Sequence, residues 1–152
     1  MIEVMVDEGI QASFSQSMLE KTVAISCFEA KNIQQPSVCI RFSSNEAVQQ
    51  LNAQWRNQDK VTDVLSFPMQ EAEALDSDES LGDMILAMPF VRDEAQRLAV
   101  AEDAHIYHLI AHSTLHLLGY DHILDADTEN MQRLENNILM KLGLHKPYPE
   151  WD

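Results

Sequence analysis

Residues 106–118 read IYHLIAHSTLHLL, and no other stretch constrains the arrangement of the chain as strongly. Its apolar residues fall on nearly every side of a helix, which is typical of a helix buried all round. We therefore expect a central helix that the other elements cover. Histidines interrupt this apolar stretch, and imidazoles buried in a core need hydrogen-bonding or metal partners.

Three histidines, His112, His116 and His122, have a spacing typical of a metal site. Residues four apart lie on one face of a helix, so the first two imidazoles can reach the same ion. Gly119 permits the positive φ at which helices commonly end, so the chain can turn back and bring His122 to the same point. Three neutral nitrogens with one open position are the ligand set of a catalytic zinc site. The alternative is three unrelated histidines on a buried helix.

The residue after the first histidine distinguishes this motif from that of zinc proteases. Proteases with the same histidine spacing carry a glutamate there, which acts as general base. Here the position is Ser113, and a serine is a poor base at neutral pH. His108 lies one turn before His112 and is interpreted as a residue outside the ligand set, either orienting a ligand or filling the core. His105 is interpreted as exposed or structural.

Other polar residues could belong to the same site. Arg56 follows Trp55, and a guanidinium can bind phosphate oxygens while an indole can stack on a base. The alternative is an ordinary surface arginine beside a core tryptophan. Asp121 precedes the third histidine and either orients a ligand or closes the turn. Asp63 and Asp83 adjoin apolar runs, which indicates either functional carboxylates or, more commonly, structural ones.

The composition is that of one domain spanning residues 1–152, with 45% hydrophobic and 23% charged residues. The net charge of −15 argues against bulk attraction to nucleic acid or anionic membranes, although it allows a local basic cleft. The chain start lacks the features of a signal peptide, and no stretch approaches the ~20 apolar residues of a membrane span. We therefore expect a cytoplasmic protein whose two cysteines, Cys27 and Cys39, are reduced thiols that bind no metal.

Periodicity divides the chain into strands and helices. Strands are expected at residues 2–6, 37–42, 61–67 and 82–88. Helices are expected at about 16–30 after Ser15, at 45–55 after Ser44, from about 91 to 118 with a break near 102–103, and at 127–142. The acidic segment 70–80 is interpreted as a solvated loop. These elements predict an α+β fold with a sheet of about four strands, packed helices, and the metal site at the end of a central helix.

The histidine motif at residues 112–122 resembles the signature of the YbeY family of rRNA-maturation endoribonucleases. The stretches 51–56 and 62–68, the latter reading TDVLSFP, resemble a second block of that family. GDMI at residues 82–85 resembles a third block. The similarity spans roughly residues 45 to 142. Within it, a serine replaces the family's usual glycine at position 113, and a tryptophan replaces the common tyrosine at position 55.

The resemblance implies an α+β fold with a small mixed sheet. It implies one zinc-like ion, or another divalent transition metal, held by His112, His116 and His122. It also implies cleavage of single-stranded RNA in 16S rRNA 3′-end maturation and ribosome quality control, in association with the small ribosomal subunit. Arg56 and His112 are then the expected catalytic residues, and Arg56 and Trp55 the expected substrate-binding residues.

Two other functions are alternatives to the endoribonuclease. One is a ribosome-assembly factor in which the metal is mainly structural, and three histidines with an open position argue against it only weakly. The other is a zinc peptidase, which Ser113 disfavours. The sequence does not identify a general base for any of these reactions.

Overall fold

The computed structural model describes residues 1–121 and 123–149. Its centre is a four-stranded mixed sheet in the order β1-β2-β4-β3. The strands are β1 (Ile2–Val6), β2 (Val38–Ser43), β3 (Val64–Pro68) and β4 (Gly82–Ala87). The first three in spatial order are parallel, and β3 pairs antiparallel with β4 at the edge of the sheet. The predicted mixed sheet of about four strands is therefore confirmed.

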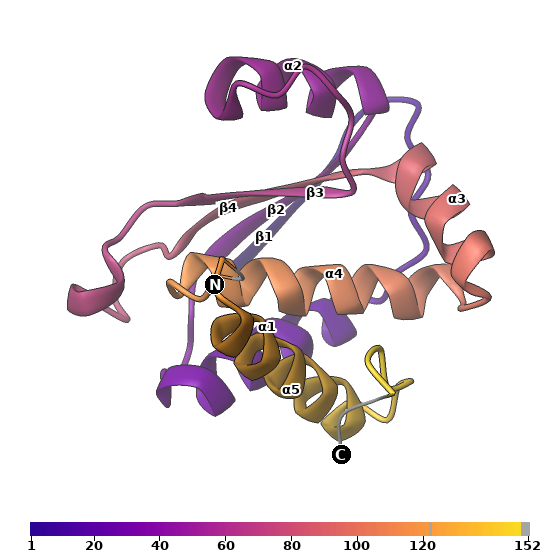
Figure 1. Ribbon diagram of the computed structural model, residues 1–152. Coiled ribbons are helices and arrows are strands. Elements are labelled where there is room, and N and C mark those ends of the chain that lie inside the picture. Colours follow the sequence, from indigo (N-terminus) through magenta and orange to yellow (C-terminus); the bar gives the residue numbers. More distant parts are fainter. Residues whose placement is uncertain (122, 150–152) are drawn as a thin grey trace.

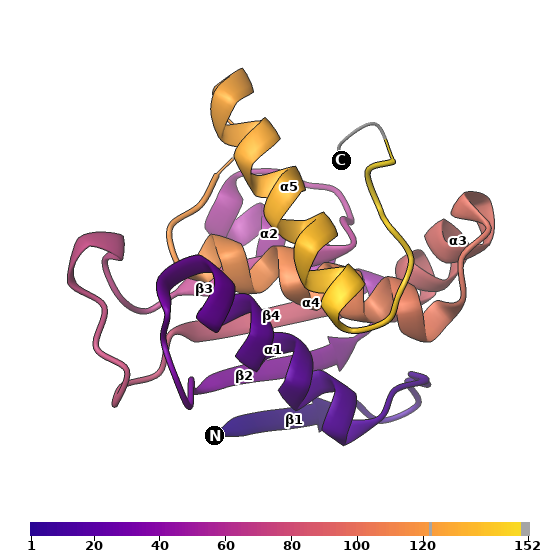
Figure 2. The same cartoon turned by 90° about the horizontal axis from the view of Figure 1, so that it is seen from below.

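In the part of the chain that the structure describes, five helices and one short turn accompany the sheet. They are α1 (Gln16–Lys31), α2 (Asn45–Arg56), the 3-10 turn η1 (Ala72–Ala74), α3 (Met88–Leu98), α4 (Glu102–Leu117) and α5 (Asp125–Lys141). Helices α1 and α4 lie against one face of the sheet, and α5 packs outside them (Figures 1 and 2). Helix α2 lies on the opposite face, beside β3 and β4 (Figure 1).

The predicted helix starts are explained by side-chain caps. The hydroxyl of Ser15 accepts from the N–H of Met18 at 3.3 Å, and that of Ser44 accepts from the N–H of Ala47 at 3.1 Å. Each bond satisfies one of the free N–H groups that a helix leaves at its first turn. The long helix expected from about residue 91 begins three residues earlier, at Met88, the first residue of α3. It breaks at residues 99–101, where Ala99 has a φ of +58°, close to the predicted break.

Helix α4 is the central element of the fold, as its all-round hydrophobicity predicts. Ile106 and Ile110 are fully buried in the core between the sheet and α1, and Leu115 is fully buried in a second cluster against α5. Burying one such side chain contributes about 1.5–3 kcal/mol. This helix therefore has little freedom to shift, and any side chain it presents at its ends is held firmly. No helix within the described ranges is long and apolar enough to cross a membrane.

Candidate metal-binding cleft

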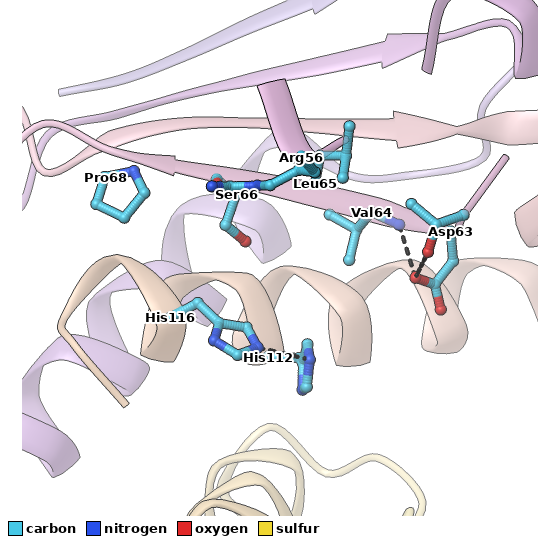
Figure 3. Close-up of a pocket in the computed structure, with 9 residues that line it drawn as sticks. Arg56, Asp63, Val64, Leu65, Ser66, Pro68, His112 and His116 are labelled. Carbon is cyan, nitrogen blue, oxygen red and sulfur yellow. Dashed lines mark hydrogen bonds between the residues drawn. The ribbon is translucent and has the colours of Figure 1, made fainter. Parts of the chain in front are cut away.

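A cleft of about 470 Å³ opens between the edge strand β3 and helix α4 (Figure 3). Arg56, at the end of α2, lines one part of it, and residues 62–66 and 68 form the wall on the side of β3. His112 and His116 line the wall on the side of α4. The arginine and two of the histidines that the sequence predicts are thus brought to one cavity, although Arg56 and His112 are 56 positions apart in the chain.

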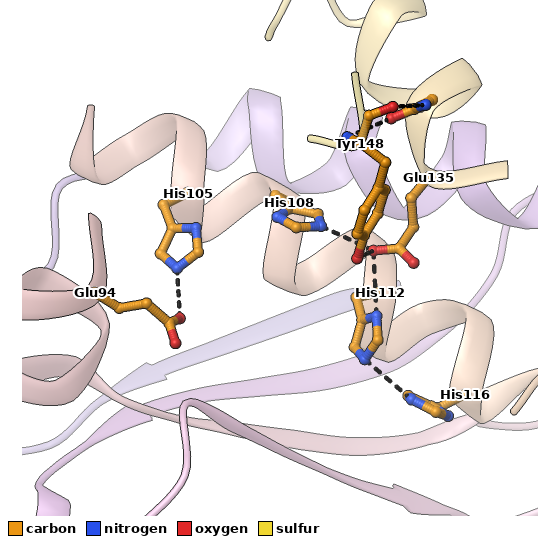
Figure 4. Close-up of polar contacts among 8 residues, drawn as sticks. Glu94, His105, His108, His112, His116, Glu135 and Tyr148 are labelled. Carbon is orange, nitrogen blue, oxygen red and sulfur yellow. Dashed lines mark hydrogen bonds and ion pairs between the residues drawn. The ribbon is translucent and has the colours of Figure 1, made fainter. Parts of the chain in front are cut away.

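The imidazoles of His112 and His116 converge, with their Nε2 atoms 3.1 Å apart (Figure 4). Nδ1 of His116 is 2.9 Å from the backbone carbonyl of Tyr120, which can only accept a hydrogen bond, so this nitrogen carries the proton. Nδ1 of His112 is 3.2 Å from a carboxylate oxygen of Glu135, which fixes the same tautomer. Both Nε2 atoms therefore present lone pairs to the same point.

That geometry fits a zinc-like ion. With Zn–N bonds of about 2.0–2.1 Å, two nitrogens of a tetrahedral site lie roughly 3.3 Å apart, close to the observed separation of the His112 and His116 Nε2 atoms. A carboxylate or carbonyl behind each ligand is also the usual support for a metal-bound histidine. The predicted third ligand, His122, lies outside the described residues. Within residues 1–121 and 123–149, no cluster of three or more metal-binding side chains is formed.

The backbone after His116 turns as the motif requires. Gly119 has a φ of +101°, and the N–H of Tyr120 returns to the carbonyl of Leu115 at 3.0 Å. A Cβ atom at Gly119 would lie 2.3 Å from the Cβ of Ala72, so both the conformation and the space demand glycine. Asp121 closes the following turn, because its Oδ1 accepts from the N–H of Ile123 at 3.3 Å.

Glu135 of α5 is a site residue that the sequence did not single out. Its side chain is 1% exposed, and its Oε1 lies 2.8 Å from Nε2 of His108 and 3.2 Å from the hydroxyl of Tyr148, in addition to its bond with His112 (Figure 4). Burial alone would raise the pKa of Glu135, but the hydrogen bonds from His108 and His112 outweigh burial and lower it to about 2. The carboxylate therefore stays ionised and orients His112.

His108 lies outside the lining of the cleft and contacts Glu135. This placement matches the interpretation of His108 as a residue that helps to orient a ligand, here through the shared carboxylate. The spacing of apolar residues in α5 could have identified Glu135 from the sequence. Positions 131, 135, 138 and 139 form one buried stripe of α5, and an acidic residue within such a stripe needs a buried partner.

Arg56 and Trp55 are neighbours in sequence that face different surfaces. The guanidinium of Arg56 donates to the backbone carbonyl of Ser66 and lies over the ring of Phe67, 5.2 Å from its centroid. Trp55 is 62% exposed and lines a separate groove of about 360 Å³, together with Phe67 and Asp83. Arg56 therefore sits at the edge of β3 between the cleft and this groove.

Ser113 and His105 are both buried on α4. The Oγ of Ser113 is 2.6 Å from the Oγ of Ser66, so the position that holds the base in zinc proteases ties α4 to β3. His105 is 2% exposed, and its Nε2 lies 2.6 Å from a carboxylate oxygen of Glu94. Of the two readings for His105, exposed or structural, the exposed one is wrong.

The two cysteines take no part in the cleft. Cys27 is buried and Cys39 is partly buried, and both are free thiols, as predicted. Burial raises the pKa of the Cys27 thiol to about 12, which keeps it protonated and unreactive at neutral pH.

Comparison with known proteins gives a consistent match over most of the chain. Residues 4–143 match the family model described as "Endoribonuclease YbeY". An Endoribonuclease YbeY of Zymomonas mobilis is 42% identical over 149 residues, covering 91% of this chain and 84% of that protein. One from Francisella philomiragia is 38% identical over 139 residues, with 90% and 87% covered. The solution structure of a Thermotoga maritima protein has the same fold, with a TM-score of 0.57, 22% identity, and 94% and 92% of the two chains covered.

Proposed function

This chain belongs to the Endoribonuclease YbeY family, and from that membership and the geometry of the cleft we propose that it is a metal-dependent endoribonuclease acting on single-stranded RNA. The observation that carries the proposal is the meeting of two convergent imidazoles and an arginine in one cleft. We further propose that its substrate is the 3′ end of 16S rRNA and that it acts with the small ribosomal subunit in rRNA maturation and quality control. The resemblance of the motifs supports these finer assignments.

The ion would be held by Nε2 of His112 and His116 and by His122. A zinc-like ion supplies Lewis-acid chemistry at neutral pH without a change of redox state. The protein's own contribution is orientation, because Glu135 and the carbonyl of Tyr120 hold each imidazole in the tautomer whose Nε2 carries a lone pair.

Arg56 supplies positive charge to the cleft of an otherwise acidic chain. Its guanidinium reaches the edge of β3 and is exposed, so it can hydrogen-bond to two phosphate oxygens of a strand lying along the cleft. Stabilising the charge that develops on those oxygens is the expected catalytic effect. Trp55 offers an exposed indole in the adjoining groove, where a neighbouring base can stack.

The peptidase alternative has a specific obstacle. The position that carries the protease glutamate is Ser113, which is fully buried, contacts Ser66 and does not line the cleft. We expect no chelator-sensitive hydrolysis of casein by the natural protein. Clear casein cleavage that disappears with a chelator would contradict the assignment to RNA.

We expect Arg56→Ala to slow the cleavage of single-stranded RNA on the order of 10²-fold, because a charge-assisted contact to the phosphate is lost. The melting temperature and metal content should not change, since Arg56 is exposed. Arg56→Lys should recover only part of the rate, because a point charge does not replace the planar guanidinium. Rates at subsaturating RNA, melting temperature and elemental analysis measure these effects.

Lys21→Ala on α1 removes the same charge from an exposed position outside the cleft and is the matched control. An Arg56→Ala variant that cleaves RNA as fast as the Lys21→Ala control would remove Arg56 from the site. Loss of metal or of folding in Arg56→Ala would instead identify the arginine as structural.

A further inference from the structure

Asp63 is a carboxylate of the cleft that takes no part in the proposed binding of metal or phosphate. Asp63, the residue before β3, lines the cleft with the histidine pair (Figure 3). Its backbone carbonyl accepts from the N–H of Ala87 at 2.9 Å, and its Oδ1 accepts from the N–H of Val64 at 2.7 Å. Strand β3 begins at Val64, later than the predicted residue 61, and these two bonds fix the backbone and the side chain of Asp63 at the cleft wall.

A second carboxylate and an imidazole lie behind Asp63. The carboxyl group of Glu94, on α3, is within hydrogen-bonding range of that of Asp63. On its other side Glu94 binds Nε2 of the buried His105 at 2.6 Å (Figure 4). Asp63, Glu94 and His105 thus form a row that starts in the cleft and ends in the core between α3 and α4.

The charges in this row can be assigned. Burial lowers the pKa of His105 to about 4, so His105 is neutral near pH 7 and donates its Nε2 proton to Glu94. Burial raises the pKa of Asp63, and the neighbouring charge of Glu94 raises it further, while His112 opposes the shift. Asp63 is therefore more basic than an ordinary aspartate.

We propose that Asp63 is the general base of the cleavage reaction, and that Glu94 and His105 are positioning residues behind it. The inference rests on the proposed endoribonuclease function. Zinc proteases carry their general base at the position of Ser113 on α4. Asp63 supplies a carboxylate for that role from the opposite wall of the same cleft. A base in this position is expected to accelerate the reaction by about 10²–10⁴-fold.

In the proposed step, Asp63 accepts a proton from a water molecule as the water oxygen bonds to phosphorus. The bond between phosphorus and the leaving ribose oxygen breaks, and that oxygen takes a proton from solvent. Asp63 then releases its proton to solvent. The products are a phosphate monoester and a free hydroxyl group, so one water molecule is consumed.

We expect Asp63→Asn to lower kcat about 10²–10⁴-fold while KM for RNA, metal content and melting temperature stay near the parent values. Asp59→Asn is the matched control, because it makes the same change in the same loop at an exposed residue outside the cleft lining. An Asp63→Asn variant that cleaves RNA as fast as the Asp59→Asn control overturns the inference but not the proposed function. A parent protein that cleaves no RNA when loaded with zinc overturns both.

The pH dependence of kcat provides a second test, because a purely structural role for Asp63 would not shift the pH profile. A base must be ionised, so kcat should rise with pH through the pKa of Asp63. Glu94→Gln removes the negative charge that faces Asp63 from α3 and leaves Arg56, His105 and His112 in place, so the acidic limb should move to lower pH. Arg97 is 3.8 Å from Glu94, and Arg97→Gln should move the limb little. An acidic limb at the same pH in the parent and in Glu94→Gln overturns the proposal.

Discussion

His116→Ala should bind no zinc-like ion, and its rate of RNA cleavage should be lower than that of the parent by roughly 10³-fold or more. The Nε2 atoms of His116 and His112 are 3.1 Å apart and their lone pairs meet at one point, so removing one imidazole removes half of the described donor set. The charge stabilisation that a metal ion gives a transition state amounts to several kcal/mol, and each 1.4 kcal/mol is about tenfold in rate. Elemental analysis of the purified protein and a single-stranded RNA cleavage assay measure both effects.

His108→Gln is the control for that experiment. His108 lies on the same helix but contacts Glu135 through Nε2 at 2.8 Å, and a glutamine amide can donate to the same oxygen. We expect His108→Gln to keep most of its metal, and His122→Ala, at the predicted third ligand, to lose it. Full metal content in His116→Ala would refute the ligand assignment.

The sequence predicted the elements of this fold because their signals are local. The caps at Ser15 and Ser44, the glycine at the end of α4 and the apolar character of α4 each depend on residues within a few positions of one another. The two histidines on α4 were predictable for the same reason, since a spacing of four fixes their shared face.

Contacts between distant segments could not be read in the same way. Glu135 meets His112 across 23 positions, and Glu94 meets His105 between two separate helices, so neither pairing follows from spacing. Trp55 and Arg56 show the opposite case, in which two neighbours in sequence reach different cavities. Adjacent residues of a helix point about 100° apart, and adjacent residues of β3 face opposite sides of the sheet. Trp55 therefore lines the groove with Phe67, while Arg56 reaches the cleft with Ser66.

Glu135→Leu should destabilise the metal-free protein by about 3 kcal/mol, because His108, His112 and Tyr148 all lose a buried acceptor. For a chain of this size that corresponds to a fall in melting temperature of roughly 6–12 °C. Glu135→Gln should destabilise the protein less than Glu135→Leu does. It should nevertheless weaken zinc affinity by about 10–100-fold, because an amide holds the His112 tautomer less firmly. Thermal unfolding without metal and competition with a zinc indicator measure the two effects separately.

The matched control for both variants is Glu129 on the same helix. Its side chain is 43% exposed and pairs with Arg133 at 2.8 Å, so Glu129→Leu and Glu129→Gln should change stability by no more than about 0.5 kcal/mol and leave zinc affinity unchanged. The Glu135 variants should differ from these controls in stability and zinc affinity only if the Glu135 carboxylate acts through the buried groups that donate hydrogen bonds to it. Equal zinc affinity in Glu135→Gln and Glu129→Gln would show that His112 keeps its orientation without Glu135, and the carboxylate would then serve the core alone.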